Sequence, residues 1–337
     1  MKRVVVLGAT GTLGLPITRH FQERGYDVIA VGHRNGSKSF FDNLGVTYST
    51  IDISDERTFI NLPNDNVDCV IDFAGCLPAM MKESDSNTLY SDSIVKGTIH
   101  VLDYMRRVGC TKLIFPQSVY DVHHLFGTAT PIPADSVRMN PVDGDHSIYV
   151  ICKNAAVDII EYYHNTYGIN TVTLRLPGVY QYHPKPYILI DGKMRIKSER
   201  VVIEKAKKGQ PIEIWGNPKR VLESICVEDF LQIVELAVLN ESAHGIFNVG
   251  NGGSTLEERL LGIRDVFCPK EKISDVIYCP EKKDCTQYVL DIQKTIDVLG
   301  YSPKFSWVDY LTNLKWHMEN EPNKDIWGTF EQYYHLL

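Results

Sequence analysis

The chain has 337 residues, of which 44% are hydrophobic, and 35 Lys and Arg stand against 42 Asp and Glu, for a formal net charge of -7. This length suffices for one large domain or two ordinary ones, and the apolar fraction excludes global disorder. The acidic balance argues against nucleic acid or an anionic membrane as the main partner, because both favour a basic face.

The cysteines bear on the setting in which the protein works. There are eight of them and no CxxC pair, which argues against a structural zinc site, and no other spacing suggests a catalytic metal. Scattered free thiols fit a reducing, cytoplasmic setting. No apolar run reaches transmembrane length, and the apolar run at 4–7 is too short for a signal peptide.

Strands and helices alternate through the first half of the chain. Continuous apolar runs predict buried strands at 4–7, 27–31, 67–73, 112–115 and 171–176. Helical patterns lie between them at 13–24, 91–108 and 148–167. This alternation predicts an α/β fold with a Rossmann-type, doubly wound parallel sheet.

A glycine-rich loop joins the first strand to the first helix, and its glycines have GxxGxxG spacing. The first permits a tight turn, the second lets a pyrophosphate approach the backbone, and the third lets the helix pack closely on the strand. The phosphates then lie at the helix N-terminus, where N–H groups are unpaired and the dipole is positive. We therefore expect a dinucleotide to bind on Gly8, Thr10, Gly11, Thr12, Leu13 and Gly14.

The end of the second strand bears on which dinucleotide binds. An acidic residue there would hold the ribose 2′-hydroxyl of NAD, but this chain has Gly32, followed by His33 and Arg34. A guanidinium suits the additional 2′-phosphate of NADP, so we favour NADP over NAD and place His33 and Arg34 in the cofactor site. The alternative is that Arg34 is a solvated loop residue or stacks on adenine without contacting the phosphate.

After residue 176 the elements become short and mixed, and Pro, Tyr and Lys become frequent. We predict a dinucleotide-binding domain over 1–175, to which 226–250 returns. Residues 176–225 and 251–337 are predicted to form a smaller C-terminal α/β substrate lobe. The active cleft should lie between the two parts, at the carboxyl ends of the parallel strands.

Tyr149 and Lys153 lie four residues apart on the predicted helix 148–167 and share one face. Because an ammonium favours the phenolate, we expect Lys153 to lower the pKa of Tyr149. Such a tyrosine can give or take the proton of a sugar or alcohol hydroxyl while a hydride moves at the neighbouring carbon. Lys153 can also hold the nicotinamide ribose. The spacing alone is common, and its place after strand 112–115 is what supports a catalytic role.

Together these motifs resemble an extended short-chain dehydrogenase/reductase of the NAD-dependent epimerase/dehydratase family, over nearly the whole chain. Residues 174–180 are similar to the family's LRxxxVYG segment, 227–229 to its VxD segment, and 291–294 with 299–303 to its C-terminal DxxK...LGxxP signature. The resemblance implies nucleotide-sugar chemistry with a nicotinamide cofactor. It adds to the cofactor site Asp52, Ile53, Phe73, Ala74, Gly75 and Pro177.

The family's third catalytic residue is a Ser or Thr that hydrogen-bonds the reacting oxygen, usually four residues before the Tyr of a VYG segment. Counting back from Tyr120 reaches Pro116, which has no hydroxyl. We therefore assign the role to Ser118. The alternative is that Ser118 is a structural turn residue and that Gln117 or a water takes its place. The Asp-Glu pair of sugar-nucleotide dehydratases is absent after Ser118, which argues against dehydration.

The predicted substrate contacts depart from the family's pattern. Gly178 stands where many relatives have Asn, and Leu222-Glu223 stands where many have an Arg-Asp that grips the sugar diphosphate. Arg220 or Lys219 can substitute for that Arg, and the alternative is that the substrate is not a standard nucleotide diphosphate sugar. We predict Gly178 and Arg220 as substrate-binding residues. The basic stretch 193–208 either helps to bind a diphosphate or is a solvated helix face.

We therefore predict an NAD(P)-dependent oxidoreductase that moves a hydride to or from a sugar carbon, with Tyr149, Lys153 and Ser118 as catalytic residues. The Gly32 and Arg34 pattern favours reduction of a nucleotide-linked keto-sugar. The alternative is a nucleotide-sugar epimerase with tightly bound NAD, and a more remote one is a non-catalytic dinucleotide-sensing protein. The resemblance also implies a homodimer that pairs helices 91–108 and 149–167.

Overall fold

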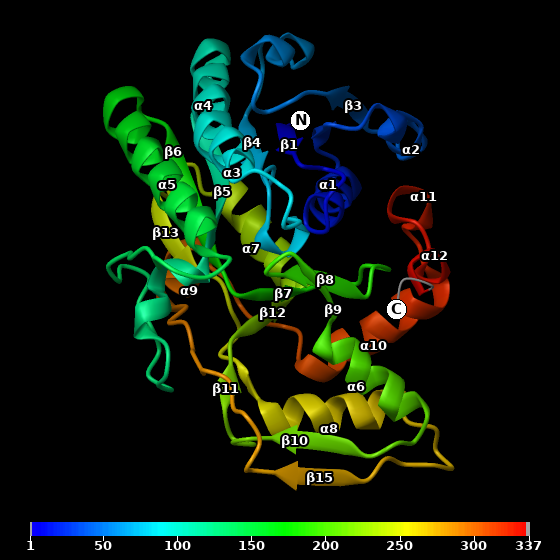
Figure 1. Cartoon of the computed structure of the whole chain (residues 1–337). Helices are drawn as coiled ribbons and strands as arrows, with labels where there is room; N and C mark the ends of the chain where they lie inside the picture. The colour runs from blue at the N-terminus through cyan, green and yellow to red at the C-terminus, as the bar shows by residue number, and fades with distance from the viewer. Residues whose placement is uncertain (1, 335–337) are drawn as a thin grey trace.

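The computed structural model describes residues 2–334. A seven-stranded sheet forms its centre, in the order β13-β6-β5-β4-β1-β2-β3, and each neighbouring pair is parallel. The strands are β1 (Arg3–Leu7), β2 (Asp27–Gly32), β3 (Thr47–Thr50), β4 (Cys69–Asp72), β5 (Lys112–Ser118), β6 (Asn170–Leu176) and β13 (Gly245–Asn248). The strand order reverses between β1 and β4, which confirms the predicted doubly wound fold (Figure 1).

Two hydrophobic layers cover the sheet, because successive residues of a strand point to opposite faces. Val4 and Val6 of β1 pack with α1 (Gly14–Glu23), α2 (Lys38–Asn43) and α7 (Val227–Leu239). Val5 and Leu7 pack on the other face with α4 (Gly97–Val108) and α5 (Ser147–Tyr167). The strands are therefore buried on both sides, as their continuous apolar runs predict.

The predicted helix 91–108 is interrupted near its start. α3 (Thr88–Tyr90) leads into a π-helical segment, Ser91–Lys96, before regular α4 begins. A Cβ on Gly97 would lie 3.1 Å from the Ile53 side chain, so α4 approaches the turn after β3 closely. Short π-helical turns are rare and frequently mark functional sites.

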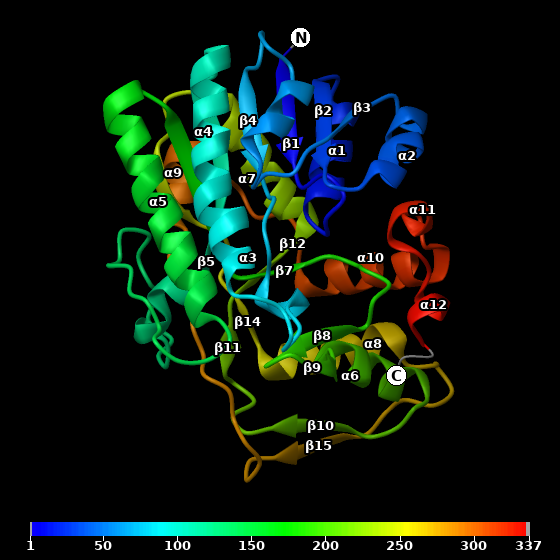
Figure 2. The same ribbon diagram turned by 45° about the horizontal axis from the view of Figure 1, so that its top comes forward.

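The second part of the molecule has its own hydrophobic cluster, in which α6 (Ser198–Lys207), α8 (Leu256–Phe267) and α10 (Trp307–Asn320) pack together. Figure 2 shows these helices below the carboxyl ends of the central strands. The small sheets pair β7 (Gly178–Tyr180) with β12 (Ser224–Cys226), β8 (Tyr187–Ile190) with β9 (Lys193–Ile196), β10 (Ile212–Trp215) with β15 (Val276–Cys279), and β11 (Val221–Leu222) with β14 (Ser254–Thr255). The remaining helices are α9 (Gln293–Leu299), α11 (Lys324–Trp327), α12 (Phe330–Tyr334) and the 3-10 turns η1 (Asn35–Ser37), η2 (Glu56–Asn61), η3 (Pro78–Met80) and η5 (Val119–Leu125).

The chain leaves the central sheet after β6 and returns to it with α7 and β13. β13 pairs with β6, and α7 packs on the same sheet. We keep the predicted division, 1–175 with 226–250 against 176–225 with 251–337, as a proposed domain organisation. Residues 1 and 335–337 of those ranges lie outside the described residues. Over residues 2–334, no helix combines the length and apolar character needed to span a bilayer.

Candidate active site

The glycine loop lies at the carboxyl end of β1, in the strand-loop-helix context that its spacing predicts. Gly8 has a φ of 80°, and a Cβ there would lie 2.6 Å from the Phe73 carbonyl oxygen. A Cβ on Gly14 would collide with the Gly8 carbonyl oxygen. Both neighbours are backbone atoms, so these two positions accept no side chain.

The loop can receive a diphosphate. Gly11 and Thr12 are exposed, and the neighbour that a Cβ on Gly11 would meet is the Gly8 carbonyl oxygen, at 3.1 Å. No side chain caps the first turn of α1. Because the first N–H groups of a helix need an acceptor, a phosphate can take the place of the cap. A nicotinamide dinucleotide therefore fits this cradle.

The absence of an acid at the end of β2 has a structural cause. A Cβ on Gly32 would lie 2.6 Å from the hydroxyl oxygen of Tyr48, and Tyr48 donates a hydrogen bond to the Arg34 carbonyl oxygen at 2.8 Å. A side chain at position 32 would therefore require the Tyr48 hydroxyl to move. His33 and Arg34 follow as exposed loop residues.

The other predicted cofactor residues follow neighbouring strands. Asp52, after β3, accepts hydrogen bonds from the N–H and hydroxyl of Ser54 at 2.9 and 2.7 Å. His100 of α4 is bonded to the Ile53 carbonyl oxygen at 2.9 Å. Phe73, Ala74 and Gly75 follow β4, and Pro177 follows β6. All of these residues lie at the carboxyl edge of the sheet.

Tyr149 and Lys153 lie on the face of α5 that packs against the sheet, and both are buried. The Tyr149 ring centroid is 6.0 Å from that of Tyr90, the residue before the π-helical segment. The Lys153 Nζ donates to the Pro116 carbonyl oxygen of β5 at 2.9 Å. It lies 4.3 Å from the Phe115 ring centroid and 6.0 Å from that of Tyr149.

The expected lowering of the Tyr149 pKa by Lys153 is wrong for this structure. The pKa of Tyr149 is raised, because burial disfavours the phenolate and Tyr90 adds to the effect. Burial lowers the pKa of Lys153 to about 8. Desolvation therefore outweighs the attraction of an ammonium that is already bonded to the Pro116 carbonyl oxygen. Burial therefore favours the phenol form of Tyr149 over its phenolate.

Ser118 ends β5, two residues after the carbonyl that binds Lys153. Its Oγ accepts the Tyr120 N–H at 3.2 Å and retains a hydroxyl proton to donate. The amide of Gln117 is used at both ends. Its Nε2 donates to Asn154 at 2.9 Å, and its Oε1 accepts the Ser118 N–H at 2.7 Å. Ser118 therefore has a free donor for a substrate oxygen, whereas both polar atoms of the Gln117 amide already have partners.

The two predicted substrate-binding residues lie in different surroundings. Gly178 is exposed at the start of β7, and no atom lies within 4 Å of the position of a Cβ. Arg220 is buried, and its Nη1 donates to Asp284. Glu223 accepts the N–H groups of Ser224, Leu290 and Asn251. Glu223, which stands at the family's Arg-Asp position, therefore binds backbone N–H groups of three segments.

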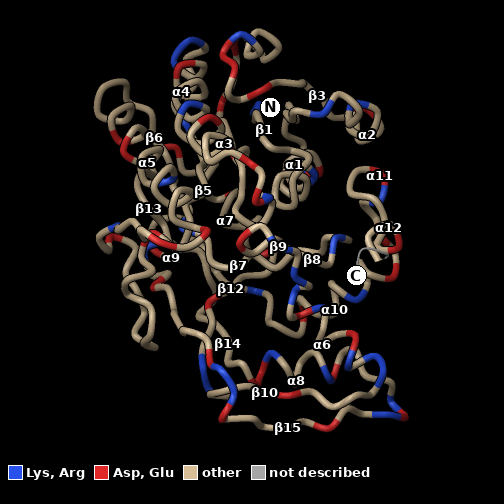
Figure 3. Tube along the Cα trace, viewed as in Figure 1, with Lys and Arg blue, Asp and Glu red and all other residues tan. Residues whose placement is uncertain are grey.

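A group of cations lies in the second lobe, and two of its three members belong to the basic stretch 193–208, for which the sequence left diphosphate binding and a solvated helix face as alternatives. We call Lys185, Lys197 and Arg200 the cation cluster, and Figure 3 marks Lys and Arg on the β8–β9 hairpin and the start of α6. Arg200 is buried. Its Nη2 donates to the His183 carbonyl oxygen at 3.0 Å, and its Nη1 has no hydrogen-bond partner among the described residues.

The cation cluster attracts negative charge. Burial and the neighbouring cations lower the pKa of His183 to about 3 and that of Lys197 to about 8. An anion would relieve this repulsion and satisfy the free donor of Arg200. A sequence signal existed, because Arg200, Ile203 and Ala206 recur at helical spacing on the buried face of α6.

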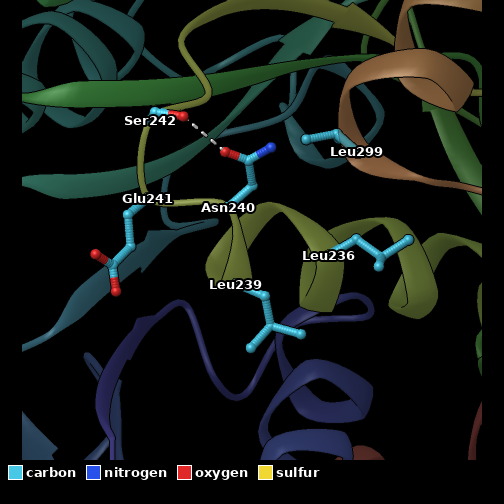
Figure 4. Close-up of a pocket in the computed structure, with 6 residues that line it drawn as sticks. All are labelled: Leu236, Leu239, Asn240, Glu241, Ser242 and Leu299. Carbon is cyan, nitrogen blue, oxygen red and sulfur yellow. Dashed lines mark hydrogen bonds between the residues drawn. The ribbon is translucent and has the colours of Figure 1, made fainter.

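A surface hollow of about 550 Å³ lies at the other edge of the sheet. Its walls come from the end of α7, the following loop and Leu299 of α9 (Figure 4). Glu241 in this wall accepts a hydrogen bond from Lys2 at 2.8 Å, and Lys2 directly precedes β1. The hollow is therefore near the amino ends of the strands, away from the glycine loop. Within residues 2–334 no group of three or more His, Cys, Asp or Glu side chains could hold a metal ion.

Several known proteins are similar to this chain in sequence or in fold. Residues 4–250 match the model of the NAD dependent epimerase/dehydratase family. A putative UDP-glucose 4-epimerase of Methanocaldococcus jannaschii is 27% identical over 89% of this chain and 93% of its own length. Among solved structures, the UDP-N-acetylglucosamine 4-epimerase of Bacillus cereus has a TM-score of 0.74 at 18% identity, over 97% of this chain and 100% of that one.

A second solved structure, the UDP-glucuronic acid 4-epimerase of Bacillus cereus in complex with NAD, has a TM-score of 0.68 at 16% identity, over 100% of this chain and 99% of that one. At such identities the two solved structures support the fold alone. The family model covers most of the chain. The chain belongs to the NAD dependent epimerase/dehydratase family and is an extended short-chain dehydrogenase/reductase.

Proposed function

We propose that this protein is a nucleotide-sugar epimerase, which removes a hydride from one sugar carbon and returns it to the opposite face. One observation carries the proposal: the glycine loop and the Tyr149–Lys153 pair are joined by contacts along a single sheet edge. Gly8 approaches Phe73 after β4, and Lys153 bonds the Pro116 carbonyl of β5, next to Ser118. These are the parts that hydride transfer at a sugar carbon requires.

Each catalytic side chain has a defined role in this proposal. NAD, when bound, would accept the hydride and later return it. The Tyr149 phenolate takes the proton of the sugar hydroxyl as the hydride leaves the carbon, and the phenol so formed returns that proton to the keto oxygen when the hydride comes back. The Lys153 ammonium favours that phenolate and holds the nicotinamide ribose. Ser118 donates a hydrogen bond to the same sugar oxygen.

The proposed substrate is a sugar linked to a nucleoside diphosphate, and a UDP-sugar is the first to test. The diphosphate is an anion, and the cation cluster offers it the unpartnered Arg200 Nη1 and the Lys197 ammonium. Gly178, with open space around it, leaves room for the sugar. Arg220 is less available to a second anion because its charge is already paired with Asp284, although its Nε has no hydrogen-bond partner among the described residues.

A second candidate is reduction of a nucleotide-linked keto-sugar with NADP. It is favoured by Gly32, which leaves the end of β2 without an acid, and by the exposed guanidinium of Arg34. Mass spectrometry of the dinucleotide released by denaturing the purified protein separates the two. Retained NAD supports the epimerase, whereas NADP, or a dinucleotide exchanged at each turnover, supports the reductase.

We also propose a cytoplasmic homodimer that pairs α4 and α5, as the resemblance to the family implies. Several apolar side chains on α5 are exposed, among them Ile148, Ile151 and Tyr162. Analytical ultracentrifugation of the purified chain tests this assembly, and a monomer at micromolar concentration would refute it.

Tyr149→Phe tests the proposed chemistry. Because the variant lacks the proton that moves at the sugar oxygen, we expect interconversion of UDP-glucose and UDP-galactose to fall by about 100-fold or more. The amount of bound dinucleotide should stay the same. Conversion is followed by proton NMR and the dinucleotide by mass spectrometry.

The matched control is Tyr162→Phe, which removes the same hydroxyl from the same helix at a side chain that is 56% exposed. It should keep the activity of the unchanged protein. Equal UDP-sugar conversion by Tyr149→Phe and the unchanged protein would reject the catalytic role of Tyr149. Binding of the dinucleotide with no conversion by either protein would favour the non-catalytic, dinucleotide-sensing alternative.

A further inference from the structure

Asp72 is a buried carboxylate at the catalytic edge of the sheet that the proposed chemistry does not use. It is the last residue of β4 and is 2% exposed. One of its carboxylate oxygens accepts the Ala74 N–H at 3.0 Å. Val70, two residues earlier, packs on the α5 side of the sheet. Because side chains alternate along a strand, Asp72 points to that same side.

Lys153 reaches the same place from α5. In the parallel pairing of β4 with β5, Ile71 is opposite Ile114, so the next rung sets Asp72 beside Phe115. The Lys153 Nζ lies 4.3 Å from the Phe115 ring centroid. The carboxylate and the ammonium therefore lie on the same face of the sheet, over adjacent strands, and both are shielded from water.

The charges around Lys153 are few. From β4 it is faced by Asp72, from β5 by the uncharged Phe115 and Pro116, and from its own helix by Tyr149. Burial lowers the pKa of Lys153, and the negative charge of Asp72 opposes that change. In return, Lys153 limits the rise in the pKa of Asp72, which burial takes to about 6.

We propose that Asp72 is a positioning residue that acts through Lys153: its buried carboxylate, on the same face of the sheet, supplies the negative charge that favours the ammonium form of Lys153 near Tyr149. A buried ammonium without a counter-charge tends to lose its proton near neutral pH. The neutral amine would no longer favour the Tyr149 phenolate. This inference rests on the proposed function for its consequence in catalysis, but the effect of Asp72 on Lys153 can be measured without substrate.

Asp72→Asn preserves the shape and removes the charge. Without the carboxylate the pKa of Lys153 falls, so the alkaline limb of the kcat profile should move to lower pH by about one unit. At pH 8 we expect kcat to fall about fivefold, and at pH 6.5 to change less than about twofold. KM for the UDP-sugar should change little, because Asp72 does not contact the substrate in this proposal.

The control for burial is Asp229→Asn. Asp229 is also a fully buried carboxylate, but it lies in the first turn of α7 and accepts the N–H groups of Lys304 and Phe305. Its substitution should lower stability and leave the alkaline limb in place. A limb that moves equally in both variants would show a structural effect and overturn the proposal.

A second measurement is independent of turnover. The pKa of Lys153 is read from the side-chain NMR signal of 13C-labelled lysine, assigned with Lys153→Arg, in the unchanged protein and in Asp72→Asn. A lower value in the variant supports the proposal, and an equal value overturns it. If Asp72→Asn does not fold, Asp72→Ser serves the same comparison. Absence of UDP-sugar conversion in the unchanged protein would instead count against the proposed function.

Discussion

Gly14 shows how a single missing methyl group shapes the cofactor site. A Cβ there would collide with the Gly8 carbonyl oxygen, which lies in the same rigid loop. Gly14→Ala should therefore push the loop from α1, weaken dinucleotide binding about tenfold or more, and lower the free energy of unfolding by about 1–3 kcal/mol. Isothermal titration calorimetry and urea unfolding measure the two effects.

The comparison variant is Gly36→Ala, since no atom lies within 4 Å of a Cβ at that exposed position. It should bind the dinucleotide as the unchanged protein does. Similar losses in both variants would mean that close packing at Gly14 is not what forms the cradle.

For single residues, the sequence predicts which side chains belong to the site better than it predicts their surroundings. The spacing of Tyr149 and Lys153 correctly predicts one helix and one face. It does not predict the direction of the Tyr149 pKa, because desolvation depends on residues such as Tyr90 that come from another helix. Asp72 was within reach of the sequence, as an acid that directly follows an apolar run at a strand end, but nothing local reveals that Lys153 is its neighbour.

At the scale of elements, the caps decide how well a helix begins. The hydroxyl of Thr255 accepts the Glu258 N–H at 3.1 Å, and the Glu258 carboxylate accepts the Thr255 N–H at 2.7 Å, which forms a capping box on α8. Thr255→Ala should lower the free energy of unfolding by about 1 kcal/mol, because it leaves the first turn without an acceptor. Urea denaturation measures this loss.

Thr312→Ala provides the contrast within α10. Thr312 donates to the Val308 carbonyl oxygen one turn earlier and caps nothing. Because Ala favours helix more than Thr, the variant should be as stable as the unchanged protein or slightly more so. A loss as large as that of Thr255→Ala would contradict the capping argument.

Elements were predictable where their pattern is local. The strands at 4–7, 27–31 and 112–115 lie within β1, β2 and β5, because continuous apolar runs between turns suit a strand buried on both faces. The π-helical segment Ser91–Lys96 was not predicted. The pattern of apolar residues in this segment is that of a regular helix. The departure from it accompanies the close approach of Gly97 to Ile53, which lies in a segment distant in sequence.

At the scale of the whole molecule, the end of the chain is attached to its beginning. Trp327 of α11 is 5% exposed, packs in the core that includes α1, and donates its indole N–H to the Thr10 carbonyl oxygen at 3.1 Å. Figure 1 shows α11 beside α1. Trp327→Ala should therefore cost about 3–5 kcal/mol in the free energy of unfolding, although it lies near the C-terminus.

Trp316→Ala is the matched substitution, because Trp316 in α10 is 52% exposed. Its cost should stay below about 1 kcal/mol. Guanidinium unfolding followed by circular dichroism measures both variants. Equal costs would show that the C-terminal segment contributes no more to the core than an exposed side chain does.

The class of fold, the glycine loop and the residues of the proposed catalytic pair can be predicted from the chain, because each depends on the spacing within a short run of residues. Other properties depend on how the chain folds. Folding buries Tyr149, sets Asp72 and Lys153 on one face of the sheet, gathers Lys197 and Arg200 near His183, and brings the Tyr48 hydroxyl close to Gly32. Charge and desolvation act through space, so these properties arise only where segments distant in sequence meet.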